Sequence, residues 1–148
     1  MRSLKKLLLI LPIIFLSAIF SSCGEVEGID INLDIPVVVD LDEEFVTQVT
    51  ITNKLTESQE LVSIDVGDGY LEGIALIKTY PNYTDQIHIP LDNTVSYSFG
   101  QDIGPHESIT IDLHWIALST GEFSDDIDFC INSELSFISR GARTKVGG

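Results

Sequence analysis

The sequence predicts an all-β fold, an antiparallel β-sandwich of about seven to nine strands over residues 29–148. Apolar and polar residues alternate with period two in several stretches of this region, and no stretch keeps the 3.6-residue apolar period of an amphipathic helix. Asn, Gly, Pro and Asp residues typical of turns separate these stretches. Strands spaced roughly 8–15 residues apart in one ordinary domain favour two packed sheets over a closed barrel.

The alternation is clearest in the stretches 45–53, 62–66, 95–99 and 109–115. Each stretch has one apolar and one polar face, as in antiparallel sheets with one face in water. In the last stretch Trp115 lies on the apolar face and His114 on the polar one. We expect the large aromatic residues of the apolar faces to fill the space between the sheets; they are Phe45, Phe99, Trp115 and Phe123.

Residues 1–23 have the three-part layout of a secretory signal. Residues 1–6 are basic, residues 7–20 are almost entirely apolar, and two serines precede Cys23. The apolar run of about 14 residues would span about 21 Å as a helix, less than the roughly 30 Å of a bilayer's hydrocarbon layer. We therefore expect a removable signal peptide and not a permanent transmembrane helix.

Residues 20–23, Phe-Ser-Ser-Cys, resemble the bacterial lipobox, in which small residues precede a Cys that is acylated and becomes the mature N-terminus. The resemblance implies a lipidated Cys23 in the bacterial cell envelope. Gly24 and not Asp follows the Cys, which is compatible with the outer membrane; the periplasmic and the surface face both stay open. The implied parts are a signal peptide (1–22), a lipid-anchored tether (23–28) and the β-sandwich domain (29–148). The alternative is an ordinary signal peptide in which Cys23 is incidental.

Charge limits the partners of the mature chain. Of the eight basic residues three lie in the signal segment, whereas all 23 acidic residues lie after it, so the net charge after residue 22 is −18. Such a surface repels phosphate backbones and anionic headgroups, which argues against nucleic-acid binding. Any attachment to the membrane must then come from covalent lipid or an apolar segment.

Three short signatures carry a second resemblance. The strand 45–53 ends in Asn53, residues 104–108 read Gly-Pro-His-Glu-Ser before an alternating strand, and residues 120–123 read Thr-Gly-Glu-Phe. These features resemble immunoglobulin-like domains of the ASPM, hydin and major-sperm-protein type and bacterial adhesion-related repeats. His106 stands where that group usually has Gly. The resemblance implies an immunoglobulin-like sandwich that serves as a binding or spacer module without catalysis.

No arrangement of residues predicts an enzyme, and no cofactor is expected apart from a possible calcium ion. The three histidines are widely spaced, unlike zinc ligands, and the sequence has neither a Gly-x-Ser-x-Gly elbow nor a Gly-rich phosphate loop. We expect a non-catalytic interaction or accessory module whose partner is an envelope protein or a glycan.

Carboxylate clusters leave calcium open as a cofactor, because calcium takes six to eight oxygen ligands. The candidate ligands are Asp40, Asp42, Asp125, Asp126 and Asp128. None of the clusters has the spaced pattern of an EF-hand loop, and solvated loop carboxylates that only aid solubility are the alternative. A calcium-dependent or carbohydrate-binding surface module is accordingly the alternative function.

Two further features bear on partners. Tyr80 and Tyr83 lie in a polar segment, where aromatic rings can stack on a sugar or anchor a protein, or else pack back on the sandwich edge. Cys130 alternates with Asp126 and Asp128 and should face away from the main core. With Cys23 acylated, Cys130 either forms an intermolecular bridge or is a half-buried small residue.

Overall fold

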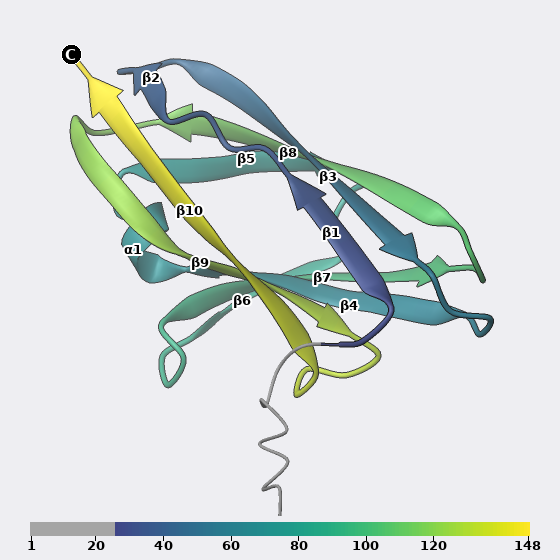
Figure 1. Ribbon diagram of the computed structural model, residues 1–148. Coiled ribbons are helices and arrows are strands. Elements are labelled where there is room, and N and C mark those ends of the chain that lie inside the picture. Colours follow the sequence, from purple (N-terminus) through teal and green to yellow (C-terminus); the bar gives the residue numbers. More distant parts are fainter. Residues whose placement is uncertain (1–25) are drawn as a thin grey trace, which may run out of the picture.

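The computed structural model describes residues 26–148, which form two β-sheets packed face to face (Figure 1). This confirms the predicted all-β sandwich. The four-stranded sheet has the order β1 (Ile29–Leu33), β3 (Glu44–Asn53), β8 (Ser108–Ala117), β5 (Ile74–Tyr80). The six-stranded sheet has the order β2 (Val38–Asp40), β10 (Phe137–Gly147), β9 (Gly121–Ile131), β4 (Gln59–Gly67), β7 (Thr94–Ile103), β6 (Asp85–Ile89).

The described region thus has ten strands, more than the seven to nine expected, because it includes short edge strands such as the three-residue β2. All strand pairs are antiparallel except β2 with β10, which is parallel. One short helix, α1 (Asp68–Leu71), connects β4 to β5.

A continuous apolar core lies between the sheets. Val49 and Ile51 of β3 are fully buried, as the alternation predicts, while Thr50 lies on the outer face. Trp115 and Phe99 are buried, whereas Phe45 and Phe123 are only partly buried against the core. Because this core draws on both sheets and on both ends of the described chain, residues 26–148 form one folding unit.

Helix α1 closes one end of this core. Its buried Tyr70 packs edge-on against Trp115, with ring centroids 5.4 Å apart. The Tyr70 hydroxyl also forms a 2.9 Å hydrogen bond with Thr144 of β10. A single side chain from the β4–β5 connection therefore joins the inner faces of both sheets.

A β-bulge in β4 changes one face assignment. The register shifts between Leu61 and Ser63, so Leu61 joins Ile64 and Val66 in the core. Val62, which the alternation placed on the apolar face with them, is only partly buried. A bulge adds one residue to a strand and resets the period-two pattern, which accounts for the difference.

The N-terminal part of the described chain lies against the domain. Val26 packs on the core, and the Gly28 carbonyl accepts a 2.9 Å hydrogen bond from the Lys54 amide. Residues 26–28, expected to belong to a free tether, thus contact the sandwich. Among the described residues no helix is long and apolar enough to cross a membrane.

Candidate binding surfaces

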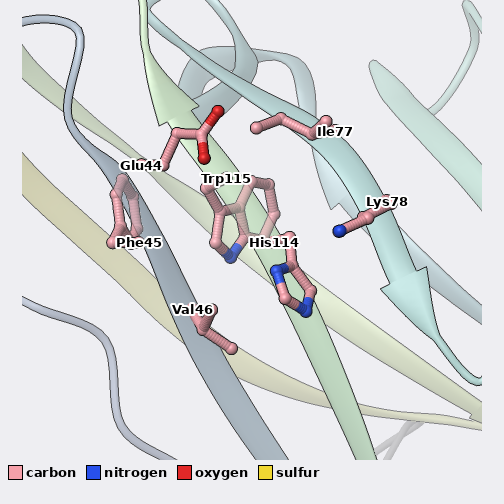
Figure 2. Close-up of a pocket in the computed structure, with 7 residues that line it drawn as sticks. All are labelled: Glu44, Phe45, Val46, Ile77, Lys78, His114 and Trp115. Carbon is pink, nitrogen blue, oxygen red and sulfur yellow. The ribbon is translucent and has the colours of Figure 1, made fainter.

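The first candidate site is a hollow on the outer face of the four-stranded sheet, with a cavity volume of about 290 Å³ (Figure 2). Strand register builds it: Val46 of β3 lies opposite His114 of β8, which lies opposite Lys78 of β5. Glu44 and Ile77 complete the rim. His114 therefore lies on the outer, polar face, as the alternation predicts.

A bulge in β5 shapes this hollow. The register of β5 against β8 shifts between Leu76 and Lys78, so Ile77 is the extra residue beside Lys78. Val46 and Ile77 are 52% and 44% exposed. The hollow combines apolar side chains with a cation, a carboxylate and an imidazole, a mixture that suits a side chain or a small polar group of a partner.

Trp115 also lines this hollow, although its side chain is only 1% exposed. Its indole Nε1 has no hydrogen-bond partner within the described part of the chain. Tryptophan Nε1 is a donor only, and a buried donor usually finds an acceptor.

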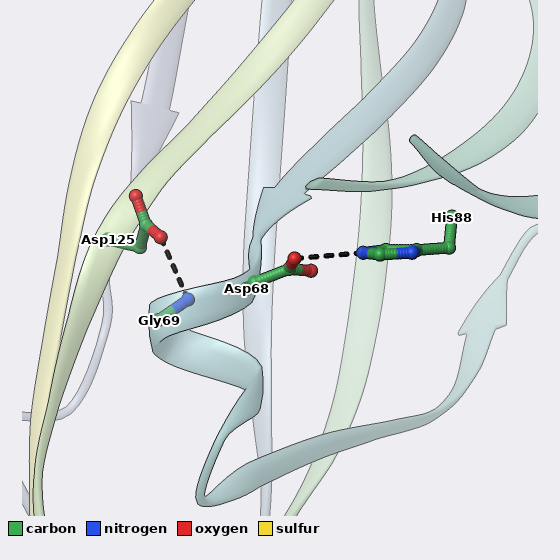
Figure 3. A network of polar contacts seen from close by, with 4 residues as sticks. All are labelled: Asp68, Gly69, His88 and Asp125. Atoms are coloured by element: carbon green, nitrogen blue, oxygen red, sulfur yellow. Dashed lines mark hydrogen bonds and ion pairs between the residues drawn. The ribbon is translucent and has the colours of Figure 1, made fainter. Parts of the chain in front are cut away.

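A polar network surrounds α1 (Figure 3). The first helical residue, Asp68, contacts His88 Nε2 of β6 at 2.8 Å. Asp125 of β9 accepts a 2.9 Å hydrogen bond from the Gly69 amide. This network ties the β4–β5 connection to two other strands, so the Asp125 carboxylate has a structural partner.

The acidic residues that the sequence groups do not converge. Asp40 and Asp42 are exposed at the end of β2 and in the following turn, and Asp40 lies beside Gly147. Along β9, Asp126 and Asp128 are on the outer face, whereas Asp125 is on the inner face beside α1. Within residues 26–148 no group of three or more His, Cys, Asp or Glu side chains is arranged to hold a metal ion. Calcium binding stays a prediction without a formed site in this region.

A second hollow, about 230 Å³, lies on the outer face of the six-stranded sheet. Asp65 of β4 is directly opposite Asp128 of β9, and both line it together with Cys130. The sequence could not show this pairing, because the two carboxylates are 63 positions apart and meet only through strand register.

The surroundings of Asp128 in this hollow change its pKa. Burial raises the pKa of Asp128, and the negative charges of Asp126, Asp65 and Asp125 raise it further, against a hydrogen bond from Ser139 that lowers it. Like charges directly opposite each other in a sheet are destabilising.

Cys130 lies on the outer face, as its alternation predicts, yet it is only 1% exposed. Its Sγ donates a 3.5 Å hydrogen bond to Asp65. Burial, with Asp65 and Asp128 nearby, raises the pKa of the thiol to about 12. A neutral, buried thiol is unreactive, which supports the small-residue interpretation over an intermolecular bridge.

The two tyrosines proposed as partner contacts differ in their surroundings. Tyr83 packs against the core, with its ring 5.1 Å from that of Tyr97. Tyr80, at the end of β5, is 72% exposed. Only Tyr80 presents most of its surface to a partner. Cys23, the proposed lipidation site, lies outside the described residues.

Comparisons with known proteins support the fold and not a family. No protein-family model matches the chain, and no curated protein sequence matches it. The cupredoxin domain of amoB from Nitrosocaldus yellowstonii is 10% identical with a TM-score of 0.51, covering 84% of this chain and 90% of that one. A CARDB domain from Pyrococcus furiosus is 12% identical, with a TM-score of 0.47 and 80% and 94% coverage.

The chain also aligns with part of the VesB protease of Vibrio cholerae, at 7% identity and a TM-score of 0.45. The aligned region covers 82% of this chain but only 32% of the protease chain. At such identities the comparisons concern the fold alone, and the amoB domain agrees with the β-sandwich seen here.

Proposed function

We propose that the protein is a lipid-anchored component of the bacterial cell envelope whose β-sandwich is an interaction or accessory module without catalytic activity. The observation that supports this proposal is the position of the sandwich in the chain relative to the lipobox-like residues. Val26 already packs on the core and β1 begins at Ile29, only a few residues after the lipobox-like residues 20–23. The proposed anchor would therefore lie within a few residues of the sandwich.

The negative charge of the domain favours a covalent anchor over electrostatic attachment to a membrane. With a net charge of −18 after residue 22, the domain surface does not attract anionic lipids. Each buried acyl CH₂ contributes about 0.8 kcal/mol, and two or more chains give stable attachment. Acylated Cys23 would therefore hold the protein at a membrane without help from the domain.

The outer face of the four-stranded sheet is the surface on which we propose that a partner binds. Val46, Ile77 and Tyr80 expose apolar area there, next to the charged and polar groups of the first hollow. Tyrosine and apolar residues with a few polar groups are typical of protein interfaces and of sugar-stacking surfaces. The proposed partner is an envelope protein or a glycan.

The anchor is tested with Cys23→Ala. Cells grown with an alkyne fatty acid should label the native protein and retain it in the membrane fraction, whereas Cys23→Ala should lose both label and membrane retention. Cys130→Ala is the matched control and should keep both, because Cys130 lies in the folded domain. Retention of Cys23→Ala in membranes would contradict the anchor.

The partner surface is tested by comparing two exposed isoleucines. Crosslinked partners that co-purify from membranes should diminish with Ile77→Ser on β5 and persist with Ile87→Ser on β6, which is 58% exposed on the other sheet. Equal recovery with both variants would place the interaction elsewhere.

A further inference from the structure

The domain leaves very little free chain between its packed N-terminus and the proposed anchor. Val26 already packs on the core, and the Gly28 carbonyl is hydrogen-bonded to Lys54. Three residue steps separate Cys23 from Val26. A fully extended chain advances at most about 3.5 Å per residue, so these steps span about 10 Å at most.

The packed N-terminus identifies one end of the sandwich. Residues Val26–Asp30 share a hollow of about 300 Å³ with Ile138 and Arg140, near the start of β10. Figure 1 shows that β1 and β10 begin at the same end of the molecule. The β9–β10 loop, residues 132–136, leads directly into β10 and therefore lies at this end as well.

Leu135 projects from that loop and is 91% exposed. A leucine exposed at the same end of the sandwich as a lipid-anchored chain start has apolar surface that a bilayer interface would bury. Tethering raises its effective concentration at the membrane without any new contact.

We infer that the short tether holds the β1–β10 end of the sandwich on the bilayer surface, where Leu135 enters the interface between headgroups and acyl chains; this rests on the proposed lipid anchor at Cys23. Glu27 lines the hollow beside the start of β10 and Glu134 precedes Leu135 in the β9–β10 loop, so zwitterionic headgroups suit this end better than anionic ones. The outer face of the four-stranded sheet then stands beside the membrane and stays open to a partner.

The test anchors the protein chemically and so does not depend on acylation in cells. The chain that begins at Cys23 is coupled through that thiol to a maleimide lipid in phosphatidylcholine vesicles. Cys130 does not compete, because it is buried and its pKa is raised to about 12. In Leu135→Trp, brominated lipids should quench the new tryptophan and its emission should shift to the blue.

Leu118→Trp is the matched control. Leu118 is 55% exposed and follows β8 at the other end of the sandwich. Along β3, Asn53 pairs with Ile29 near the tether, whereas Glu44 pairs with Ile116 next to the Leu118 turn. The buried Trp115 contributes the same background to both variants. Quenching should be large for residue 135 and absent for residue 118.

A longer tether provides the second arm. A 20-residue Gly/Ser insertion between Cys23 and Val26 has a root-mean-square length of about 25 Å, and it should reduce quenching of Leu135→Trp while coupling is retained. The inference is overturned by no quenching at residue 135, by equal quenching at both positions, or by quenching that the insertion leaves unchanged. Those results leave the cellular anchor untouched, since fractionation of Cys23→Ala tests it separately.

Discussion

Asn53, the last residue of β3, is a fully buried polar residue with a complete set of partners. Its side-chain amide donates to the carbonyls of Glu57, Ile103 and Gly104 at 2.8–3.1 Å. Its Oδ1 accepts a 2.9 Å hydrogen bond from the Leu55 amide. One side chain thereby joins the β3–β4 turn to the β7–β8 turn, which explains why an asparagine ends this strand.

Replacing Asn53 with Ala should lower the free energy of unfolding by about 2–3 kcal/mol, because buried carbonyls and an amide lose their partners. Urea denaturation measures this as a lower midpoint with an unchanged slope. Thr52→Ala is the control. The Thr52 hydroxyl forms a hydrogen bond with the Ser108 hydroxyl on the exposed outer face, and the loss of this bond should cost about 1 kcal/mol or less. Equal effects of the two changes would refute the role of Asn53.

Asp128 makes stability depend on pH. Burial and neighbouring carboxylates raise the pKa of Asp128 in the folded state. The folded chain therefore holds this proton more tightly than the unfolded chain, and the group's stabilising effect is present in acid and lost as pH rises through the raised pKa. Neutral pH is where the ionised Asp128 destabilises the fold.

Asp128→Asn should accordingly be more stable than the native protein at neutral pH, and the difference should vanish as the pH falls below about 4, where the native carboxyl is also protonated. Thermal melting across this range measures the difference. Asp102→Asn removes one exposed charge outside this cluster and serves as the control. If the stability difference between Asp128→Asn and the native protein grew toward acid pH, the pKa of Asp128 would be lowered by folding and not raised.

At the scale of elements, the connection between β4 and β5 depends on close packing against β9. A Cβ on Gly69 would lie 2.8 Å from the Ser124 backbone oxygen, whereas a Cβ on Gly141, on the outer face of β10, would meet nothing within 4 Å. The close approach of α1 to β9 therefore requires a glycine at position 69, whereas Gly141 of β10 has room for a side chain.

Gly69→Ala should destabilise the protein by about 1–3 kcal/mol, because backbone must move to admit the methyl group. Gly141→Ala should be neutral or stabilise by about 0.5–1 kcal/mol, because glycine weakens a strand through its conformational entropy. Thermal melting of the two variants measures both effects. A Gly69→Ala protein as stable as the native one would show that α1 does not pack tightly on β9.

At the scale of the whole molecule, the charge of −18 after residue 22 opposes compaction. Raising NaCl from about 0.01 to 0.5 M should raise the melting midpoint, because salt screens repulsion among exposed carboxylates. MgCl₂ and CaCl₂ at equal ionic strength should act alike. An additional rise that saturates with calcium alone would instead support the calcium hypothesis.

For two of the stretches whose alternation was clear, 45–53 and 109–115, the inner and outer faces could be predicted from the sequence. Val49 and Ile51 are buried while Thr50 is not, and Trp115 is buried while His114 faces outward. These assignments follow from the alternation of side chains along an extended backbone, which is local. The alternation failed at Val62, since a bulge leaves no signal in the composition of a strand.

By itself, the sequence determined the all-β class, the two-faced strands and the surplus of acid, because each depends on local periodicity or on counting charges. Only the tertiary structure decided which surfaces exist. Cross-strand register brought Val46, His114 and Lys78 into one hollow, and Asp65 beside Asp128. In the folded domain Cys130 is buried, Tyr83 packs against the core and Tyr80 is exposed. Such neighbours are separated by tens of residues, so only the packing of the two sheets determines which of them meet.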